Sequence, residues 1–421
     1  MLIKKLKQLS SDQFIRNISW LGSAELVQRI FRLATTVTLA RVFTPYDYGM
    51  VSVIATTFQF ANTLSLRAGI GAKLIQADEQ ELEIICNTAY WLNWILCLSL
   101  AIIQCIASYP IAWFYDNNQL ILPICTLSLI YLMFPIFMVQ SALIERENRL
   151  NVRAWCYAAQ AIVSNIIIVG LALLDMGVWA VVWSMVLSYP VWIVITYSNH
   201  PWRPPKSVSL KQWKNITSFG SKLLGVELLN KLRLNIDYLL VGRFLGMEVL
   251  GLYFFAFNAG LGISQSVLNA LGSAWYPHFC QVREDLKELK KRYFGSFKMI
   301  GAIVLPLVIL QTSLAPFYVP IVFGEKWVTA IPVLILICFS ALPIALSRST
   351  SRLLQALDKA HIDLGWNVIF TVLFTTSLLL VMQGGIFWVA VSVLITQLVA
   401  MPIFALWIIR YVFGKRSASS D

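Results

Sequence analysis

The sequence is poor in charged residues and lacks the motifs of common soluble enzymes. Only 13% of its 421 residues are Asp, Glu, Lys or Arg, whereas about a quarter are charged in an average soluble domain. No GxxxxGK[ST] motif is present for nucleotide phosphates, and none of the three histidines belongs to an HExxH zinc motif. These absences exclude ATP as the energy source and disfavour a zinc hydrolase. The apolar composition also excludes a disordered chain, which needs high charge and low hydrophobicity.

The cysteines and the N-terminus show no disulfide, metal or leader pattern. There are seven cysteines, no CxxC occurs, and most of them lie in apolar runs. We therefore interpret them as small hydrophobic residues and predict no metal site. The first residues have no short apolar core followed by a small-residue cleavage site, so we expect no cleaved signal peptide.

What the sequence does have is long apolar segments, with 58% hydrophobic residues overall. A membrane-spanning helix needs about 20 mostly apolar residues. Twelve segments meet this requirement, and the first and seventh are the weakest because they carry charges. They are 17–40, 48–66, 84–109, 119–143, 154–174, 178–198, 217–241, 249–272, 296–316, 329–347, 361–382 and 386–409. The predicted fold class is an all-α polytopic membrane protein with about 12 transmembrane helices.

The basic residues of the loops indicate an orientation. With the N-terminus placed in the cytoplasm, 25 of the 33 Lys and Arg residues fall in cytoplasmic segments and three fall outside. Cytoplasmic loops are enriched in Lys and Arg, and a wrong number of spans would have scrambled this alternation. The net charge of +12 is therefore explained by topology, and we predict no binding of nucleic acid. Both termini are expected to be cytoplasmic.

An internal repeat divides the chain into two halves. At an offset of 202 residues, Ala24–Arg29 aligns with Val226–Lys231, Ala40–Phe43 with Gly242–Leu245, and Tyr48–Gly49 with Leu250–Gly251. Six spans separate the copies, so both have the same orientation, as in transporters built from parallel repeats. We predict a cytoplasmic segment 1–16, an N-lobe 17–198 with six spans, a linker 199–216, a C-lobe 217–410 with six spans, and a cytoplasmic tail 411–421.

Two spans carry charges that are costly in a membrane. Glu25, Arg29 and Arg32 of the first span lie within about 60° of one helix face. The seventh span carries Lys222, Glu227, Lys231, Arg233 and Asp237. Glu227–Lys231 and Arg233–Asp237 have the spacing of helical ion pairs. Self-neutralising pairs are one interpretation of these charges.

A wet cavity for an anion is the other interpretation, and two observations favour it. The Glu/basic pair recurs at the same offset in both halves, and five cations face only three acids in the two spans. Charges within membrane spans commonly line substrate or ion pathways. The candidate substrate-binding cations are Arg29, Arg32, Lys231, Arg233 and Lys222. The candidate ion-coupling or pairing acids are Glu25, Glu227 and Asp237.

Four further segments carry a resemblance to a known family: Leu39–Gly49, Pro201–Pro204, Asn235–Gly246 with its continuation Leu250–Tyr253, and Phe323–Trp327. They resemble the polysaccharide-transport (Wzx-type) flippases of the multidrug/oligosaccharidyl-lipid/polysaccharide (MOP) superfamily. The resemblance runs from about residue 15 to 410. It implies two parallel lobes of MATE-like fold and movement of an undecaprenyl-diphosphate-linked oligosaccharide across a bacterial plasma (inner) membrane. Cationic central cavities are usual in the family, which fits Arg29, Arg32 and Lys231.

The resemblance also implies a role in the assembly of O-antigen, capsule or exopolysaccharide by alternating access. It implies membrane lipids, a polysaccharide polymerase and other assembly proteins as partners. No cofactor is expected beyond H⁺ or Na⁺ coupling. The alternatives are a multidrug exporter of the same superfamily, which would favour an acidic cavity, and a non-transporting component of an assembly complex. An oligosaccharide polymerase would need a large outer loop, and none is found, so we predict that the protein is not an enzyme.

Overall fold

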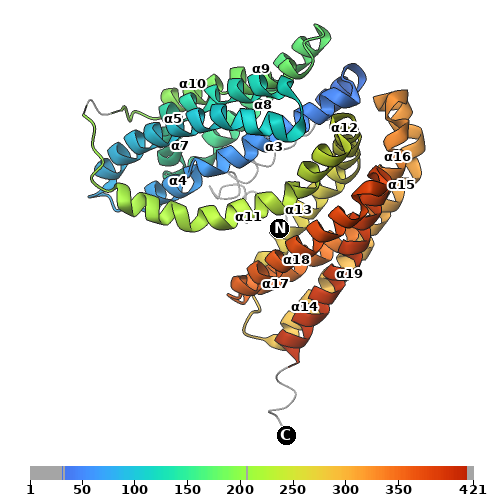
Figure 1. Cartoon of the computed structure of the whole chain (residues 1–421). Coiled ribbons are helices and arrows are strands. Elements are labelled where there is room, and N and C mark those ends of the chain that lie inside the picture. The colour runs from blue at the N-terminus through green and yellow to red at the C-terminus, as the bar shows by residue number, and fades with distance from the viewer. Residues whose placement is uncertain (1–30, 32–33, 205–206, 415–421) are drawn as a thin grey trace, which may run out of the picture. The chain divides into compact units, whose positions relative to one another are not determined.

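The computed structural model describes residues 31, 34–204 and 207–414, and among these the chain is helical with short turns and no strand (Figure 1). Contacts divide the chain into two compact units. Unit 1 comprises Met1–Phe43 and Val53–Leu232, and unit 2 comprises Thr44–Ser52 and Arg233–Asp421. Two helices change unit along their length, namely α3 (Pro45–Leu64) and α11 (Trp213–Leu245).

Unit 1 consists of antiparallel helices joined by short turns. Besides its parts of α3 and α11, it contains α4 (Arg67–Gln76), α5 (Leu82–Tyr115), α6 (Ile121–Leu127), α7 (Leu129–Arg146), α8 (Leu150–Leu173), α9 (Val178–Ser188) and α10 (Pro190–Asn199). The helix α5 packs on α7, and α8 packs on α9 and α10. A buried cluster that includes Ile85, Leu92 and Val139 forms its core beside α4.

Unit 2 repeats this plan with more irregular helices. It contains α12 (Met247–Ala256), α13 (Gly262–Cys280), α14 (Leu286–Met299), α15 (Leu305–Tyr318), α16 (Ile331–Phe339), α17 (Ala341–Ala356), α18 (Ala360–Val381) and α19 (Ile386–Phe413). Three π-helical turns, at Phe257–Leu261, Ile300–Val304 and Val319–Phe323, continue α12, α14 and α15. The helix α17 packs against α13 and α19 at the centre of this unit.

Eleven of the twelve predicted spans coincide with helices of the structure. Most of the first predicted span, 17–40, lies outside the described residues, but 34–42 are helical. Within the described part of the chain, eight helical stretches are long and apolar enough to cross a membrane, or nine if the bent pair Met247–Leu261 and Ser264–Cys280 is one span. The charged helix α11 is not among them, in line with the weak hydropathy of the seventh span.

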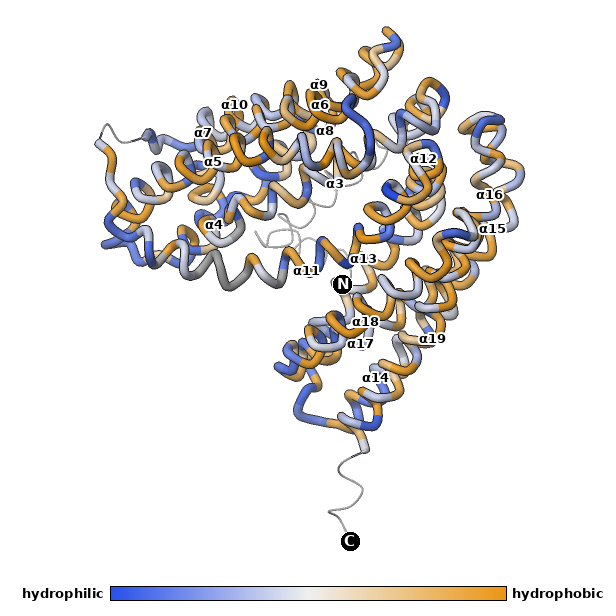
Figure 2. The backbone as a smooth tube through the Cα atoms, viewed as in Figure 1, coloured by the Kyte–Doolittle hydropathy of each residue, from blue (hydrophilic) through white to orange (hydrophobic). Residues whose placement is uncertain are grey.

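The surfaces of the helices are apolar as well as their interiors. Large side chains such as Trp113, Ile321 and Leu380 are 81%, 70% and 79% exposed. Figure 2 shows hydrophobic residues along the long helices and hydrophilic residues at their ends and turns. Such an apolar surface is favourable only in a lipid environment. Helices can lie in lipid because they satisfy their backbone hydrogen bonds internally. The chain is therefore an all-α, multi-pass membrane protein.

The two copies of the internal repeat meet in unit 2 in a two-fold relation. A Cβ added to Gly49 would overlap the backbone carbonyl oxygen of Met247, and one added to Gly251 would overlap that of Pro45. Pro45 and Met247 are themselves 202 residues apart, as are Gly49 and Gly251. The start of α3 and the start of α12 thus cross at backbone contact through equivalent glycines, as small residues allow in membrane helix pairs.

Three of the four segments that carry the family resemblance contribute residues near this crossing, and the fourth, Pro201–Pro204, lies in unit 1. Tyr48 lies 4.8 Å from the Trp327 ring, which stacks on Phe255 at 4.1 Å between ring centroids. Nearby, the Tyr253 hydroxyl donates a 2.8 Å hydrogen bond to Asp237. Tyr253, Phe255 and Trp327 are at most 1% exposed. These segments are therefore explained by packing, and they say nothing about the transported molecule.

Candidate functional site

The break between α3 and α4 brings an arginine into the body of unit 1. The Ser65 hydroxyl donates to the Asn62 carbonyl oxygen at 2.6 Å, which competes with the helical pattern at the end of α3. Leu66 then adopts a left-handed conformation with φ of 53°, a costly state for a residue with a branched side chain. The chain restarts as α4 at Arg67. The strained residue Leu66 thus forms a sharp turn, and the Arg67 side chain after it points across the unit.

Arg67 has an aromatic partner and no acidic one. Its guanidinium carbon lies 3.8 Å from the centroid of the Phe134 ring and 5.5 Å from that of Phe137, both on α7. Its Nε is buried without a hydrogen bond, and no ion pair of this side chain occurs among the described residues. Its electrostatic neighbours include the hydroxyls of Tyr157 and Tyr189. A cation stacked on a ring keeps donors for an incoming anion.

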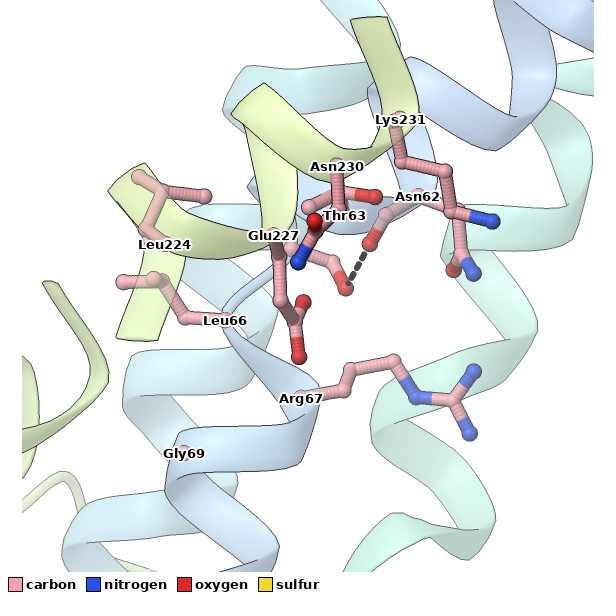
Figure 3. A pocket seen from close by; sticks show the side chains of 10 residues that line it. Asn62, Thr63, Leu66, Arg67, Gly69, Leu224, Glu227, Asn230 and Lys231 are labelled. Atoms are coloured by element: carbon pink, nitrogen blue, oxygen red, sulfur yellow. Dashed lines mark hydrogen bonds between the residues drawn. The ribbon is translucent and has the colours of Figure 1, made fainter. Parts of the chain in front are cut away.

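Arg67 lines a polar cavity of about 360 Å³ together with residues of α3 and α11. The other lining residues are Asn62, Thr63, Ser65, Leu66, Gly69, Leu224, Glu227, Asn230 and Lys231. In Figure 3 the Glu227 carboxylate points from α11 toward the Arg67 side chain, and the Lys231 side chain extends on the far side of Asn230. Lys231 Nζ donates to Gln59 Oε1 at 3.3 Å. Two cations and one acid thus face a cavity whose lining is mostly uncharged.

The structure brings together only part of the predicted site. Glu227 and Lys231 both line the cavity, and no ion pair of Glu227 occurs among the described residues. Glu25, Arg29 and Arg32 lie outside the described residues. Lys222 belongs to α11, but its side chain is also outside what the structure describes.

Asp237 and Arg233, whose spacing allows an ion pair, each have another hydrogen-bond partner. Asp237 is 5% exposed and accepts hydrogen bonds from the Tyr253 hydroxyl and the Tyr238 backbone N–H. Arg233 Nη1 instead donates to Asn367 Oδ1 of α18 at 2.7 Å. The i, i+4 spacing allowed the pair, but each side chain finds a nearer partner on another helix of unit 2.

Arg233 belongs to a group of three arginines in unit 2. It interacts electrostatically with Arg348 of α17 and with Asp363 of α18, and Arg352 of α17 neighbours both. Arg348 donates to Asn269 at 2.6 Å, Arg352 to Gln355 at 2.7 Å, and the Asp363 carboxylate accepts from Ser351 at 2.7 Å. The Nε of Arg233 is buried without a partner. Two of the three guanidinium groups, those of Arg233 and Arg352, neighbour the Asp363 carboxylate, so the group has an excess of positive charge.

The sequence interpretation missed Arg67, Arg348 and Arg352 because it placed them in cytoplasmic loops. The helix α17 continues to Ala356, beyond the predicted end at 347, and therefore includes both of its arginines. Arg67 directly follows the predicted span 48–66 and precedes the apolar residues of α4. A cation at the edge of a span, with no acid within one helical turn, is the signal that could have identified Arg67.

Comparison with known proteins identifies the family. The sequence profile of the family described as "Polysaccharide biosynthesis protein" matches residues 38–332. The chain belongs to this family. Among its relatives, the teichuronic acid biosynthesis protein TuaB of Bacillus subtilis is 25% identical over 412 residues, covering 96% of this chain and 83% of TuaB. The lipopolysaccharide biosynthesis protein WzxC of Escherichia coli is 25% identical over 418 residues, covering 96% of this chain and 82% of WzxC.

Solved structures show the fold of this family member. An inward-facing multidrug resistance MATE family transporter of the MOP superfamily aligns with a TM-score of 0.76 at 14% identity, covering 93% of this chain and 96% of the transporter. The lipid II flippase MurJ in an inward closed conformation aligns with a TM-score of 0.75 at 11% identity, covering 93% of this chain and 87% of MurJ. The predicted MOP fold, with about twelve helices in two parallel six-helix lobes, is confirmed.

Proposed function

We propose that this protein is a flippase that moves an undecaprenyl-diphosphate-linked oligosaccharide from the cytoplasmic to the outer leaflet of a bacterial plasma membrane. The observation that carries the proposal is Arg67, a cation with unused donors in a polar cavity of a family member from polysaccharide biosynthesis. The relatives TuaB and WzxC, named for the biosynthesis of teichuronic acid and of lipopolysaccharide, support the class of cargo.

The cargo has three parts with different demands. The diphosphate is an anion, and charge-assisted hydrogen bonds to arginine are worth roughly 1.5–3 kcal/mol each. Arg67 and Lys231 supply such donors in unit 1, and Arg233 with its neighbours supplies them in unit 2. The sugars need polar surroundings, since burial of unpaired hydroxyls in hydrocarbon is costly. The polyprenyl chain is expected to remain in the lipid.

The predicted cations outside the described residues belong to the same proposal. Arg29, Arg32 and Lys222 are expected to add to the binding of the diphosphate. Among the acids, Asp237 is hydrogen-bonded and buried, which favours a packing role. Glu227 lines the cavity and makes no ion pair among the described residues, so it is the preferred H⁺- or Na⁺-coupling acid, with Glu25 as the other candidate.

The proposal includes orientation and partners. Both termini lie in the cytoplasm, as the loop charges predict. Transport rather than catalysis is the activity, with membrane lipids around the protein. A polymerase and other assembly proteins would take up the exported oligosaccharide.

The test is a reconstituted flipping assay. The probe is lipid-linked oligosaccharide extracted from the native host after deletion of this gene, where it is expected to accumulate in the cytoplasmic leaflet. Proteoliposomes with the purified protein should expose this lipid to an external glycosidase much faster than empty liposomes. Equal exposure in both, together with lost export in the deletion strain, would instead favour a non-transporting assembly component. Export of organic cations by the same proteoliposomes would favour the multidrug alternative.

A further inference from the structure

A second cavity in unit 1 has a different chemistry. It measures about 310 Å³ and is lined by residues of helix 34–42, α8, α9 and the junction of α9 with α10. Its polar side chains include Thr35, Gln160, Ser164, Asn165 and Tyr189, and no Asp, Glu, Lys or Arg is among the described residues that line it. Hydroxyl, amide and phenol groups therefore dominate the described part of the lining.

Several of these polar groups are held in fixed orientations. The Asn165 amide nitrogen donates to the Ala161 carbonyl oxygen at 2.6 Å, and its oxygen accepts from the Thr35 hydroxyl. Gln160 Oε1 accepts a 2.7 Å hydrogen bond from Trp192 Nε1, which leaves the amide donors of Gln160 on the side of Tyr189. Side chains locked by such contacts can bind a ligand with little further loss of entropy.

The cavity also keeps unused hydrogen-bonding capacity and rigid aromatic walls. Among the described residues, the Ser164 hydroxyl has no hydrogen-bond partner, although it lines the cavity. The Tyr157 ring packs edge-on against Trp192 at 5.0 Å, and the Tyr189 ring packs on Phe134 at 5.3 Å. Fixed aromatic rings beside donors and acceptors suit a ligand with apolar faces and many hydroxyl edges.

This chemistry discriminates among ligand classes. Among the described lining residues, an organic cation would find no carboxylate to pair with, and a phosphate would find no basic side chain. An acyl chain would leave the amide and hydroxyl groups unsatisfied, which costs roughly 1–3 kcal/mol for each buried group. An uncharged sugar ring presents hydroxyls that both donate and accept, and it matches the lining.

The position of the cavity connects it with Arg67. Tyr157 and Tyr189 line this second cavity and are electrostatic neighbours of the Arg67 guanidinium. Phe134 contacts both Arg67 and Tyr189. A diphosphate held by Arg67 would thus place its attached sugars beside this cavity.

We propose that the second cavity is a saccharide-binding site that holds an uncharged sugar residue of the cargo next to the diphosphate on Arg67. This inference rests on the proposed function and adds to it a place where the oligosaccharide itself is recognised. It assigns Ser164, Asn165 and Gln160 as residues that contact sugar.

The experiment compares two probes on the purified protein in detergent. One is the lipid-linked oligosaccharide extracted from the deletion strain, and the other is undecaprenyl diphosphate without sugar. The variants are Ser164→Ala, Asn165→Leu and Arg67→Ala. The matched control is Ser184→Ala on α9, because the Ser184 hydroxyl is already used by the Val181 carbonyl oxygen at 2.8 Å. Thermal unfolding of each variant monitors its folding.

The expected results separate the sugar site from the anion site. Wild-type protein should bind the sugar-bearing lipid more tightly than the bare diphosphate. Ser164→Ala and Asn165→Leu should lower the affinity for the sugar-bearing lipid roughly two- to tenfold, the size of a neutral hydrogen bond. Their affinity for the bare lipid should not change. Arg67→Ala should lower the affinity for both probes. Ser184→Ala should change the affinity for neither probe.

Two other outcomes would contradict the inference in different ways. Unchanged affinity of Ser164→Ala and Asn165→Leu for both probes, or equal loss for both, would overturn the saccharide site while leaving the proposed function standing. Failure of the folded wild-type protein to bind either probe would overturn the proposed function itself.

Discussion

At the residue scale, two arginines of unit 1 that look alike in sequence have opposite environments. Arg146 uses its guanidinium to bond the carbonyl oxygens of Leu74, Ile75 and Ala77 at the end of α4, and it pairs with Glu79 at 2.8 Å. Arg67 instead lies on the faces of Phe134 and Phe137 and forms no ion pair within the described part of the chain. A cation that closes a helix end stabilises the fold, whereas a cation without an acid is available for a ligand.

Replacement of Arg146 should therefore reduce stability more than transport. In Arg146→Ala the carbonyl groups at the end of α4 lose charged donors, and we expect a loss of roughly 2–3 kcal/mol in unfolding free energy. The measurement is thermal or denaturant unfolding in detergent, with flipping normalised to folded protein. The control is Lys290→Ala on the charged helix α14, which should change neither quantity. Normal stability of Arg146→Ala together with lost flipping would reverse the roles assigned here.

The charge of Glu227 gives a second prediction at this scale. If Glu227 binds the coupling proton beside Arg67 and Lys231, Glu227→Gln should still flip lipid but should lose its response to an imposed pH gradient. The assay is flipping in proteoliposomes with and without the gradient. Asp237→Asn serves as the comparison, because Asp237 bonds Tyr253 and is expected to show reduced stability instead. A normal gradient response in Glu227→Gln would exclude this residue as a necessary proton site.

At the scale of the elements, the equivalent glycines of α3 and α12 set the closest helix contact. Gly49→Ala should force the Met247 backbone away, because the new methyl group overlaps its carbonyl oxygen. Overpacking of this kind typically costs about 1–3 kcal/mol, and we expect a lower melting temperature and less folded protein.

Gly170→Ala in α8 is the matched control for this prediction. A Cβ at Gly170 meets nothing within 4 Å, and alanine favours helix over glycine. This variant should melt at the wild-type temperature or above it. If Gly49→Ala were equally stable, the close crossing of α3 and α12 would be wrong.

Much of this helical framework could be predicted from the sequence. Apolar length and loop charge located α5, α8 and the other hydrophobic spans, and the repeat supported the charged α11 where hydropathy was weak. The predicted span 48–66 ends at the break after α3, but the left-handed turn at Leu66 could not be predicted, because no glycine or proline marks it. The partners of Arg233 and Asp237 also escaped prediction, since Asn367 and Tyr253 come from other helices and spacing along one helix cannot reveal them.

At the scale of the whole molecule, the fold and the family are shared by proteins with different cargoes, so the proposed cargo rests on the side chains of this chain. The structural neighbours include proteins named for drug resistance and for lipid II, so the fold alone does not choose between cations and lipid-linked sugars. In unit 1 the choice rests on two cavities: the described lining of one has excess positive charge, and that of the other has no charged residue. Together they match the diphosphate and the sugars of one lipid-linked molecule.

The orientation of the whole chain is also testable. The loop asymmetry of 25 to 3 places Lys290 in the cytoplasm and Asp116 outside. In intact cells, a membrane-impermeant thiol reagent should label Asp116→Cys and miss Lys290→Cys, in a background where the native cysteines are replaced. Labelling of Lys290→Cys in sealed cells would overturn the orientation.

The flipping rate of Arg67 variants tests the central claim most directly. In proteoliposomes loaded with the extracted lipid-linked oligosaccharide, Arg67→Ala should flip roughly 10- to 100-fold more slowly than wild type, the loss expected for one charge-assisted contact. Arg67→Lys should recover part of the rate, and unfolding should show that Arg67→Ala is as stable as wild type. A wild-type rate in folded Arg67→Ala would contradict the account, because the cation without an acidic partner would then have no part in moving the lipid.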